Sequence, residues 1–257
     1  MSTPMTAALL TVEGLSKAFG RVVTANNMSF QIHAGGITSI IGPNGAGKST
    51  LINILSGSIP PDRGRIFLRG KEITRLPTHR RVRLGLCRSF QVVNVFPALT
   101  VFENIQIPAL SKAGKAHHVF RGLSRESGAR ERVMDVLERV KLVDRAHTIA
   151  GELSHGDQRL LEVAIALAVQ PILLFLDEPT AGMNPVERVE ILQNIRHLSA
   201  TGRTTFVIVE HDMDIVFSLS DRVMVLHRGE IICDGPPDHV KSDEQVRECY
   251  LGEEVAE

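Results

Sequence analysis

The sequence has no tryptophan, one tyrosine and three cysteines among its 257 residues. Aromatic residues make up only 4% of the chain, so few rings are available to stack on nucleobases. An excess charge of either sign is also missing, because 29 basic residues balance 29 acidic ones. Since general nucleic-acid binders are usually basic, both features argue against a nucleic-acid partner. Cys87, Cys233 and Cys249 share no short spacing and cannot all pair, which favours reduced thiols over a disulfide framework.

Long hydrophobic runs are scarce as well. Residues 1–10 lack a basic segment followed by a long apolar core, so the sequence predicts no secretory signal. Residues 160–176 are nearly all apolar, but this stretch contains Glu162 and is broken by Gln170 and Pro171. A buried helix followed by a buried strand accounts for it better than a membrane span. We therefore expect a globular chain that is soluble by itself.

Strand-like and helix-like patterns alternate along the chain. Short alternating strands are expected within residues 9–37. Apolar runs of strand length follow at residues 37–41, 66–68, 84–90, 172–176, 206–209, 223–226 and 231–233. Helical spacing is found at residues 48–55, 185–198 and 215–219, and through much of 100–168. This alternation predicts an α/β core with a mostly parallel sheet.

A polar stretch at residues 111–130 interrupts the helical pattern and is rich in Lys, Arg and His. It is either a solvated connection or a surface for lipid head groups or a protein partner, and the sequence leaves both interpretations open.

Residues 42–50 match the phosphate-loop pattern G-x-x-x-x-G-K-[ST], with an apolar strand before the loop and a helix after it. Glycines let successive backbone N–H groups point at one anion, and the helix adds its positive N-terminal end. Lys48 is expected to reach the β- and γ-phosphates of a nucleotide, and the Ser49 hydroxyl to hold Mg²⁺. The predicted phosphate-binding residues are Gly42, Pro43, Asn44, Gly45, Ala46, Gly47, Lys48, Ser49 and Thr50.

Two adjacent carboxylates, Asp177 and Glu178, end the apolar run at residues 172–176. Open α/β sheets place their ligand sites at this end of the strands. Asp177 suits Mg²⁺, directly or through water, and Glu178 suits the role of orienting and polarising the attacking water. The alternative is that the acidic pair only caps a following helix.

Residues 153–159, Leu-Ser-His-Gly-Asp-Gln-Arg, resemble the signature motif of ABC-transporter ATPases. Further family elements follow the expected order: Gln91 is similar to the Q-loop glutamine, residues 181–184 occupy the D-loop position, and His211 resembles the switch histidine. Phe19 stands where the family places an aromatic ring on adenine. The resemblance covers nearly the whole chain.

This resemblance implies a P-loop NTPase fold of ABC type, with a mostly parallel core sheet, an N-terminal antiparallel β subdomain and an inserted α-helical subdomain. Residues 1–95 and 160–257 would form the core with the antiparallel subdomain, and residues 96–159 the helical signature subdomain. The cofactors implied are ATP and Mg²⁺.

Ser154 precedes an apolar helical stretch and is a natural N-cap, while Gly156 exposes nearby backbone N–H groups. In the family this helix end faces the γ-phosphate held by a second ATPase subunit, so two ATP molecules are sandwiched in a head-to-tail dimer. The sequence departs from the family at His155 and Asp157, and Asp157 is equally well explained as part of a capping box. Asn184 replaces the commoner D-loop aspartate and also fits an N-cap.

Three site residues depend on the resemblance for their roles. His211, at the end of an apolar strand, would by itself be read as structural, but the family implies contact with the γ-phosphate and positioning of Glu178. Gln91 is implied in catalysis and in holding Mg²⁺. Phe19 by itself would be read as a core residue, and only the family implies adenine stacking.

The resemblance implies the ATP-hydrolysing subunit of an importer at the cytoplasmic face of the membrane. Its implied partners are an identical or homologous ATPase subunit, permease subunits and, indirectly, a solute-binding protein. Residues 92–102, with Phe96 and Pro97, are the expected docking surface for the permease, and core packing is their alternative. The signature and D-loop forms, the basic stretch and the Tyr250-Leu251-Gly252 ending are similar to ATPases of branched-chain amino-acid importers, whose relatives serve urea and short amides. Rival interpretations are a soluble non-transport ABC ATPase and a nucleotide-binding regulator without turnover.

Overall fold

The computed structural model describes residues 8–89, 95–112 and 127–254. Its centre is a six-stranded sheet with the order β10-β9-β3-β8-β7-β6. The strands are β10 (Glu230–Gly235), β9 (Arg222–His227), β3 (Ile37–Ile41), β8 (Thr205–Val209), β7 (Leu173–Asp177) and β6 (Leu86–Arg88). Every neighbouring pair is parallel except β10–β9. The predicted mostly parallel α/β core is therefore confirmed.

The strands β3, β7 and β8 are buried at every position, which explains why their sequences are continuous apolar runs rather than alternating patterns. The predicted strand at residues 84–90 is shorter in the structure. Helix α2 (Thr78–Arg83) ends immediately before it, and Gly85 turns the chain with a φ of 95° before β6 begins.

A second sheet of four antiparallel strands has the order β2-β1-β4-β5. Its strands are β1 (Ala8–Phe19), β2 (Val22–His33), β4 (Arg63–Leu68) and β5 (Lys71–Glu72). Helix α1 (Lys48–Ser56) is buried between the two sheets, because Leu51 belongs to the same hydrophobic cluster as Leu10 of β1 and Phe175 of β7. This packing fixes the start of α1 near the carboxyl end of β3, an interior strand of the central sheet.

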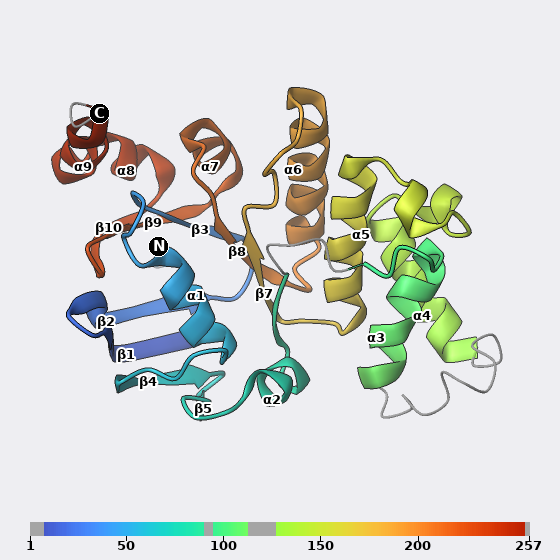
Figure 1. Ribbon diagram of the computed structural model, residues 1–257, viewed down its shortest axis with the longest axis horizontal. Coiled ribbons are helices and arrows are strands. Elements are labelled where there is room, and N and C mark those ends of the chain that lie inside the picture. The colour runs from blue at the N-terminus through green and yellow to red at the C-terminus, as the bar shows by residue number, and fades with distance from the viewer. Residues whose placement is uncertain (1–7, 90–94, 113–126, 255–257) are drawn as a thin grey trace, which may run out of the picture.

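Helices gather at the opposite end of the molecule from the antiparallel sheet (Figure 1). They are α3 (Val101–Lys112), α4 (Ser127–Arg139) and α5 (His155–Ala168), with short 3₁₀ turns at Val143–Arg145 and Ala150–Glu152. The three helices pack on one another, and Leu161 of α5 shares a hydrophobic cluster with Leu176 of β7. The helical region therefore rests on the central sheet through a continuous core.

The apolar stretch at residues 160–176 is the predicted buried helix and strand, since α5 ends at Ala168 and β7 begins at Leu173. None of the helices in the described part of the chain is both long and apolar enough to cross a bilayer.

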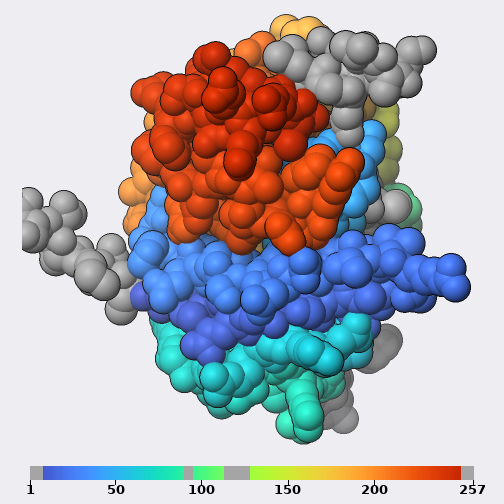
Figure 2. All heavy atoms as spheres, turned by 90° about the vertical axis from the view of Figure 1, so that its left-hand side faces the viewer, coloured from blue at the N-terminus to red at the C-terminus, as the bar shows by residue number. Residues whose placement is uncertain are grey.

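The remaining helices are α6 (Pro185–Ala200), α7 (Met213–Leu219), α8 (Pro237–Ser242) and α9 (Glu244–Glu254). Figure 2 shows the C-terminal elements, in red, lying above the N-terminal strands, in blue. The hydrophobic core of these C-terminal elements includes Cys233 of β10, Val240 of α8 and Val246 of α9. All three cysteines lie outside disulfides, as the sequence predicts.

Candidate functional site

The phosphate loop joins β3 to α1, and close backbone contacts explain two of its glycines. A Cβ atom on Gly42 would lie 2.1 Å from the Leu226 carbonyl oxygen, and one on Gly47 would lie 2.2 Å from the Thr24 carbonyl oxygen. Their φ angles of 151° and 105° also fall where glycine is favoured. The loop can adopt this path only with glycine at both positions.

The turn between β9 and β10 supports the loop from outside, which the sequence did not predict. The Gly229 N–H donates to the Ala46 carbonyl at 3.0 Å, and the Asn26 N–H donates to the Gly229 carbonyl at 2.7 Å. The β9–β10 hairpin, which lies far from the phosphate loop in sequence, thus joins this loop to the antiparallel sheet.

The Lys48 side chain is buried and its ammonium donates to the carbonyls of Gly42 at 2.5 Å and Pro43 at 2.9 Å. Beside it is a cavity of about 330 Å³. Its lining consists of Val22, Thr24, Asn44, Gly45, Ala46, Gly47, Lys48, Ser49, Thr50, Glu178, Val209 and His211. One cavity therefore collects most of the predicted phosphate-binding residues and both predicted catalytic residues that the structure describes.

Glu178 and His211 meet at the edge of this cavity. The His211 Nε2 lies 2.6 Å from the Glu178 Oε1, although the residues come from the ends of different strands, β7 and β8. Glu178 has a φ of 47°, a conformation that is uncommon outside glycine. The helix-cap alternative for Glu178 is wrong, because the next helix, α6, is capped by Asn184. The His211 side chain is 47% exposed, so it is not a core histidine.

Asp177 lies in the protein interior and forms an ion pair that the sequence did not predict. The Arg88 Nη2 donates to the Asp177 Oδ2 at 2.7 Å, and the Arg88 Nη1 donates to the Asn53 Oδ1 of α1 at 2.5 Å. Arg88 thereby connects the phosphate-loop helix, β6 and the acidic end of β7. A sequence signal existed, since Arg88 stands three residues before the glutamine of the Q-loop resemblance.

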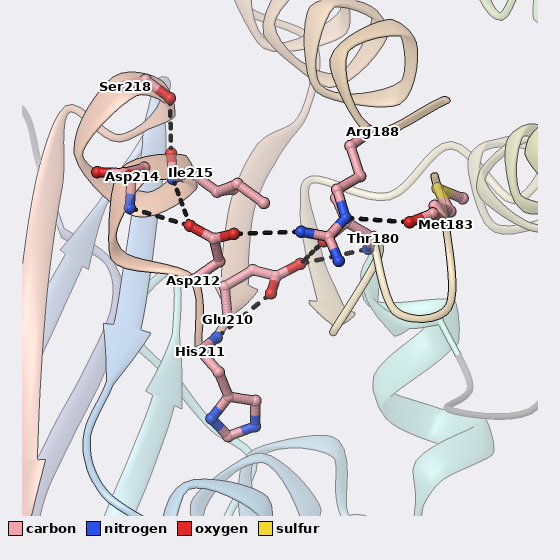
Figure 3. A network of polar contacts seen from close by, with 9 residues as sticks. All are labelled: Thr180, Met183, Arg188, Glu210, His211, Asp212, Asp214, Ile215 and Ser218. Atoms are coloured by element: carbon pink, nitrogen blue, oxygen red, sulfur yellow. Dashed lines mark hydrogen bonds and ion pairs between the residues drawn. The ribbon is translucent and has the colours of Figure 1, made fainter. Parts of the chain in front are cut away.

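A second buried carboxylate, Glu210, lies directly before His211 (Figure 3). It accepts hydrogen bonds from the Thr180 Oγ1 at 2.7 Å, the Thr180 N–H at 3.2 Å and the His211 N–H at 3.3 Å. Burial raises the pKa of Glu210 above its usual range, with a smaller contribution from the nearby Glu178 carboxylate, and the hydrogen bonds act in the opposite direction. The imidazole of His211 projects away from this network.

Arg188 of α6 adds an outer contact between the same segments. Its guanidinium donates to the Asp212 Oδ2 at 3.2 Å and to the Met183 carbonyl at 3.2 Å (Figure 3). Asp212 also caps α7 by accepting from the N–H groups of Asp214 and Ile215. The segment after Glu178 and the segment around His211 are thus joined by both a buried and an exposed contact.

The signature segment lies apart from this cavity. Ser154 is the N-cap of α5, as predicted, and accepts from the Asp157 N–H at 3.1 Å. Within the described residues, no bond from the Asp157 carboxylate back to Ser154 completes a capping box. Ser154 is exposed and Gly156 partly exposed, and neither lines the cavity.

Asn184 shows the N-cap geometry that the sequence predicts. Its side chain accepts from the N–H groups of Val186 and Glu187, and the Glu187 carboxylate accepts from the Asn184 N–H to complete a capping box. The departure from the family's aspartate therefore has a local structural use.

Phe19 is 48% exposed at the end of β1, so the core interpretation of this residue is wrong. The Lys17 Nζ lies 5.3 Å from the centre of its ring. Val22 and Thr24 of the same hairpin line the cavity, whereas Phe19 does not. Gln91 lies outside the described residues, as do residues 92–94 of the expected docking surface and most of the basic stretch at 111–130.

A family model described as ABC transporter matches residues 25–181, and one described as branched-chain amino acid ATP-binding cassette transporter matches residues 230–256. The sequence is 38% identical over 256 residues to the high-affinity branched-chain amino acid transport ATP-binding protein LivG of Escherichia coli K12, covering 97% of this chain and all of that one. It is 37% identical to the corresponding protein BraF of Pseudomonas aeruginosa, with the same coverage.

Solved structures show the same architecture. The ADP conformation of MJ1267, an ATP-binding cassette of an ABC transporter, aligns with a TM-score of 0.84 and 33% identity over 96% of this chain and all of that one. A dimeric post-hydrolysis state of the ATP-binding cassette MJ0796 bound to ADP and Pi aligns with a TM-score of 0.73 and 25% identity over 89% of this chain and 98% of that one. Phosphate loop, fold and relatives together define an ATP-binding cassette. The chain belongs to the ABC transporter family of ATPases.

Proposed function

We propose that this chain hydrolyses ATP and that Glu178 is the general base. The observation that carries the proposal is the single cavity shared by the phosphate loop, Glu178 and His211. Backbone N–H groups of the loop and the Lys48 ammonium would hold the β- and γ-phosphates, since both are fixed donors at a helix N-terminus. Glu178 would then accept a proton from the attacking water, and His211 would orient that carboxylate through the 2.6 Å contact.

Mg²⁺ is part of this proposal because the oxygen donors that it prefers are present. Ser49 lines the cavity, and the carboxylate of Asp177 ends strand β7, which β8 separates from β3, with one oxygen engaged by Arg88. Ser49 and Asp177 would hold the ion, together with Gln91. When bound, Mg²⁺ neutralises charge on the phosphate oxygens.

We further propose that a second ATPase subunit, identical or homologous, completes the site. Within one chain the N-cap end of α5 is exposed and separate from the cavity, so Ser154 and Gly156 are available to another subunit's γ-phosphate. The similar cassette MJ0796 was solved as a dimer. Phe19, half-exposed near the cavity-lining residues of its hairpin, would stack on adenine.

The proposed biological role is to energise an importer for branched-chain amino acids from the cytoplasmic face of the membrane. The relatives LivG and BraF, matched over essentially their whole length, support this substrate class. Importers of urea or short amides are the alternative within the family. A soluble ABC ATPase unconnected with transport is the alternative from another class.

A groove beside the site offers a docking surface for the permease subunits. A cavity of about 220 Å³, largely apolar, lies between β6 and the helices α2, α3 and α5. Its lining includes Arg88 and Ser89, so it adjoins the Asp177 ion pair. Phe96 follows these residues in the sequence and is 55% exposed. This exposure supports the predicted docking role of Phe96 over the alternative that it packs in the core. We also propose that residues 1–95 and 160–257 form the core with the antiparallel subdomain and that residues 96–159 form the helical subdomain.

Substitution of the proposed base tests the ATPase. Glu178→Gln removes the proton acceptor but keeps the shape of the side chain, so hydrolysis should fall by at least about 100-fold while ATP binding persists. ATP should then trap a dimer detectable by light scattering. Near-normal turnover in Glu178→Gln would refute the assigned base.

Membrane association and solute coupling test the transport role. The chain should co-purify from membranes with permease subunits, and in proteoliposomes the complex should take up leucine in an ATP-dependent manner. The Glu178→Gln complex is the control, because it should assemble but not transport. Uptake of urea instead of leucine would shift the substrate class, and absence from membranes would favour the non-transport alternative.

A further inference from the structure

The Glu178–His211 pair depends on two separate segments of the chain. Glu178 follows β7 and His211 follows β8, and their side chains approach to 2.6 Å. General-base catalysis is sensitive to small displacements of the base, and a shift of about 1 Å can cost a factor of about 100 in rate. Something must therefore keep the two segments in register with each other.

The carboxylate of Glu210 contacts both segments at once. Thr180 lies two residues after Glu178, and it gives Glu210 a hydroxyl bond of 2.7 Å and a backbone N–H bond of 3.2 Å. The same carboxylate receives the His211 N–H at 3.3 Å. Both Glu210 and Thr180 are buried, which shields the two bonds between them from water, and the bond from His211 is partly buried.

A carboxylate is a costly choice for a buried position whose purpose is stability alone. Burying a charge or a polar group lowers stability unless partners compensate, and well-packed apolar side chains usually stabilise such a site at least as well. The three donors converging on Glu210 are all fixed by the segments that carry Glu178 and His211. This arrangement uses the carboxylate to set the distance between two chain segments.

We propose that Glu210 and Thr180 are positioning residues that hold Glu178 and His211 in their reactive arrangement. They act through the backbone of both segments and do not contact the nucleotide. This inference rests on the ATP hydrolysis proposed above, and it adds two residues to which neither the sequence patterns nor the family match assigned a role.

The test compares two isosteric changes at equally buried threonines. Thr180→Val removes the hydroxyl bonded to Glu210, whereas Thr204→Val removes a hydroxyl bonded to the Pro171 carbonyl at 2.8 Å at the other end of β8. Thr180 and Thr204 are each 3% exposed. Thr180→Val should lower kcat at least about tenfold with KM and the ATP Kd within about twofold of wild type. Thr204→Val should leave kcat within about twofold of wild type. Thr180→Ser keeps the hydroxyl, so its kcat should also stay within about twofold of wild type.

Glu210→Gln provides an independent variant. The Thr180 donors contact Oε1 and the His211 N–H contacts Oε2, so an amide with one acceptor oxygen must place its NH2 group opposite the donors of one of the two segments. It should show the same fall in kcat with preserved ATP affinity. Wild-type kcat in Thr180→Val, or an equal loss in Thr204→Val, would overturn the positioning role. A loss of ATP affinity that matches the loss of kcat would also overturn it. If the wild-type chain itself did not hydrolyse ATP, the proposed function would fail instead, so the two failures are distinguishable.

Discussion

The ion pair between Arg88 and Asp177 makes a strong prediction about stability. The Asp177 side chain is 2% exposed and the Arg88 side chain 16%, with 2.7 Å between the Arg88 Nη2 and the Asp177 Oδ2. Arg88→Met keeps much of the aliphatic volume but leaves the carboxylate inside the protein without its cation. Removing one partner of a buried pair costs about 3–5 kcal/mol, because the remaining charge stays desolvated. We expect a loss of this size in the free energy of unfolding.

An exposed pair in the antiparallel sheet is the matched control. The Arg65 Nη2 lies 3.0 Å from the Glu13 Oε2, but these side chains are 63% and 47% exposed. Since water screens such a pair, Arg65→Met should cost no more than about 1 kcal/mol. Asp177→Asn placed in the Arg88→Met background should recover at least about 2 kcal/mol, because no buried charge then remains.

Urea unfolding followed by far-ultraviolet circular dichroism is the suitable assay, since the chain has no tryptophan for fluorescence. The free energies of wild type, Arg88→Met, Asp177→Asn and the variant with both changes form a double-mutant cycle that isolates the interaction between Arg88 and Asp177. Equal losses for Arg88→Met and Arg65→Met would refute the reasoning, because burial would then have no influence on the value of the ion pair.

Three further predictions concern the loop, a buried thiol and the pH dependence. Lys48→Ala should weaken ATP binding about 10- to 100-fold by calorimetry, because hydrogen bonds to charged groups contribute about 1.5–3 kcal/mol, and unchanged affinity would contradict the assigned role. Burial raises the pKa of the Cys87 thiol from 9.0 to about 11, so its alkylation at pH 8 should be about 100-fold slower in the folded than in the urea-unfolded chain by mass spectrometry. Comparable rates would show that the thiol is not protected. Because burial raises the pKa of Glu210 above 4.5, the fold favours its protonated form, and the resulting stabilisation is lost as the pH rises through the folded-state pKa. The unfolding free energy of wild type relative to Glu210→Gln should therefore decrease as the pH rises from about 4.5 to 7, and a constant difference would refute this sign.

Local patterns were sufficient for the phosphate loop and the central strands. The loop requires glycines at fixed positions, a lysine and a following helix, and all of these are adjacent in sequence. Strands such as β7 and β8 read as continuous apolar runs because a parallel sheet is covered on both faces. The caps Ser154 and Asn184 were likewise predictable, since a side chain bonds to N–H groups two or three residues away.

Phe19 shows where local patterns mislead. An apolar ring in an alternating strand reads as core, but this one lies at the end of β1, where the hairpin turns, and it is 48% exposed. Its exposure depends on where the strand ends relative to the packed layer, which composition and periodicity do not specify.

The amino-acid sequence by itself determined which residues form the predicted phosphate loop, because that loop is one unbroken segment of chain. Only the tertiary structure decided which side chains meet across strands. Glu178 finds His211 33 residues away, Thr180 finds Glu210 30 residues away, and Asp177 finds Arg88 89 residues away. These pairs form because β7 lies between β6 and β8 in the sheet. Strand order depends on how the crossover helices pack, so no short stretch of sequence encodes it.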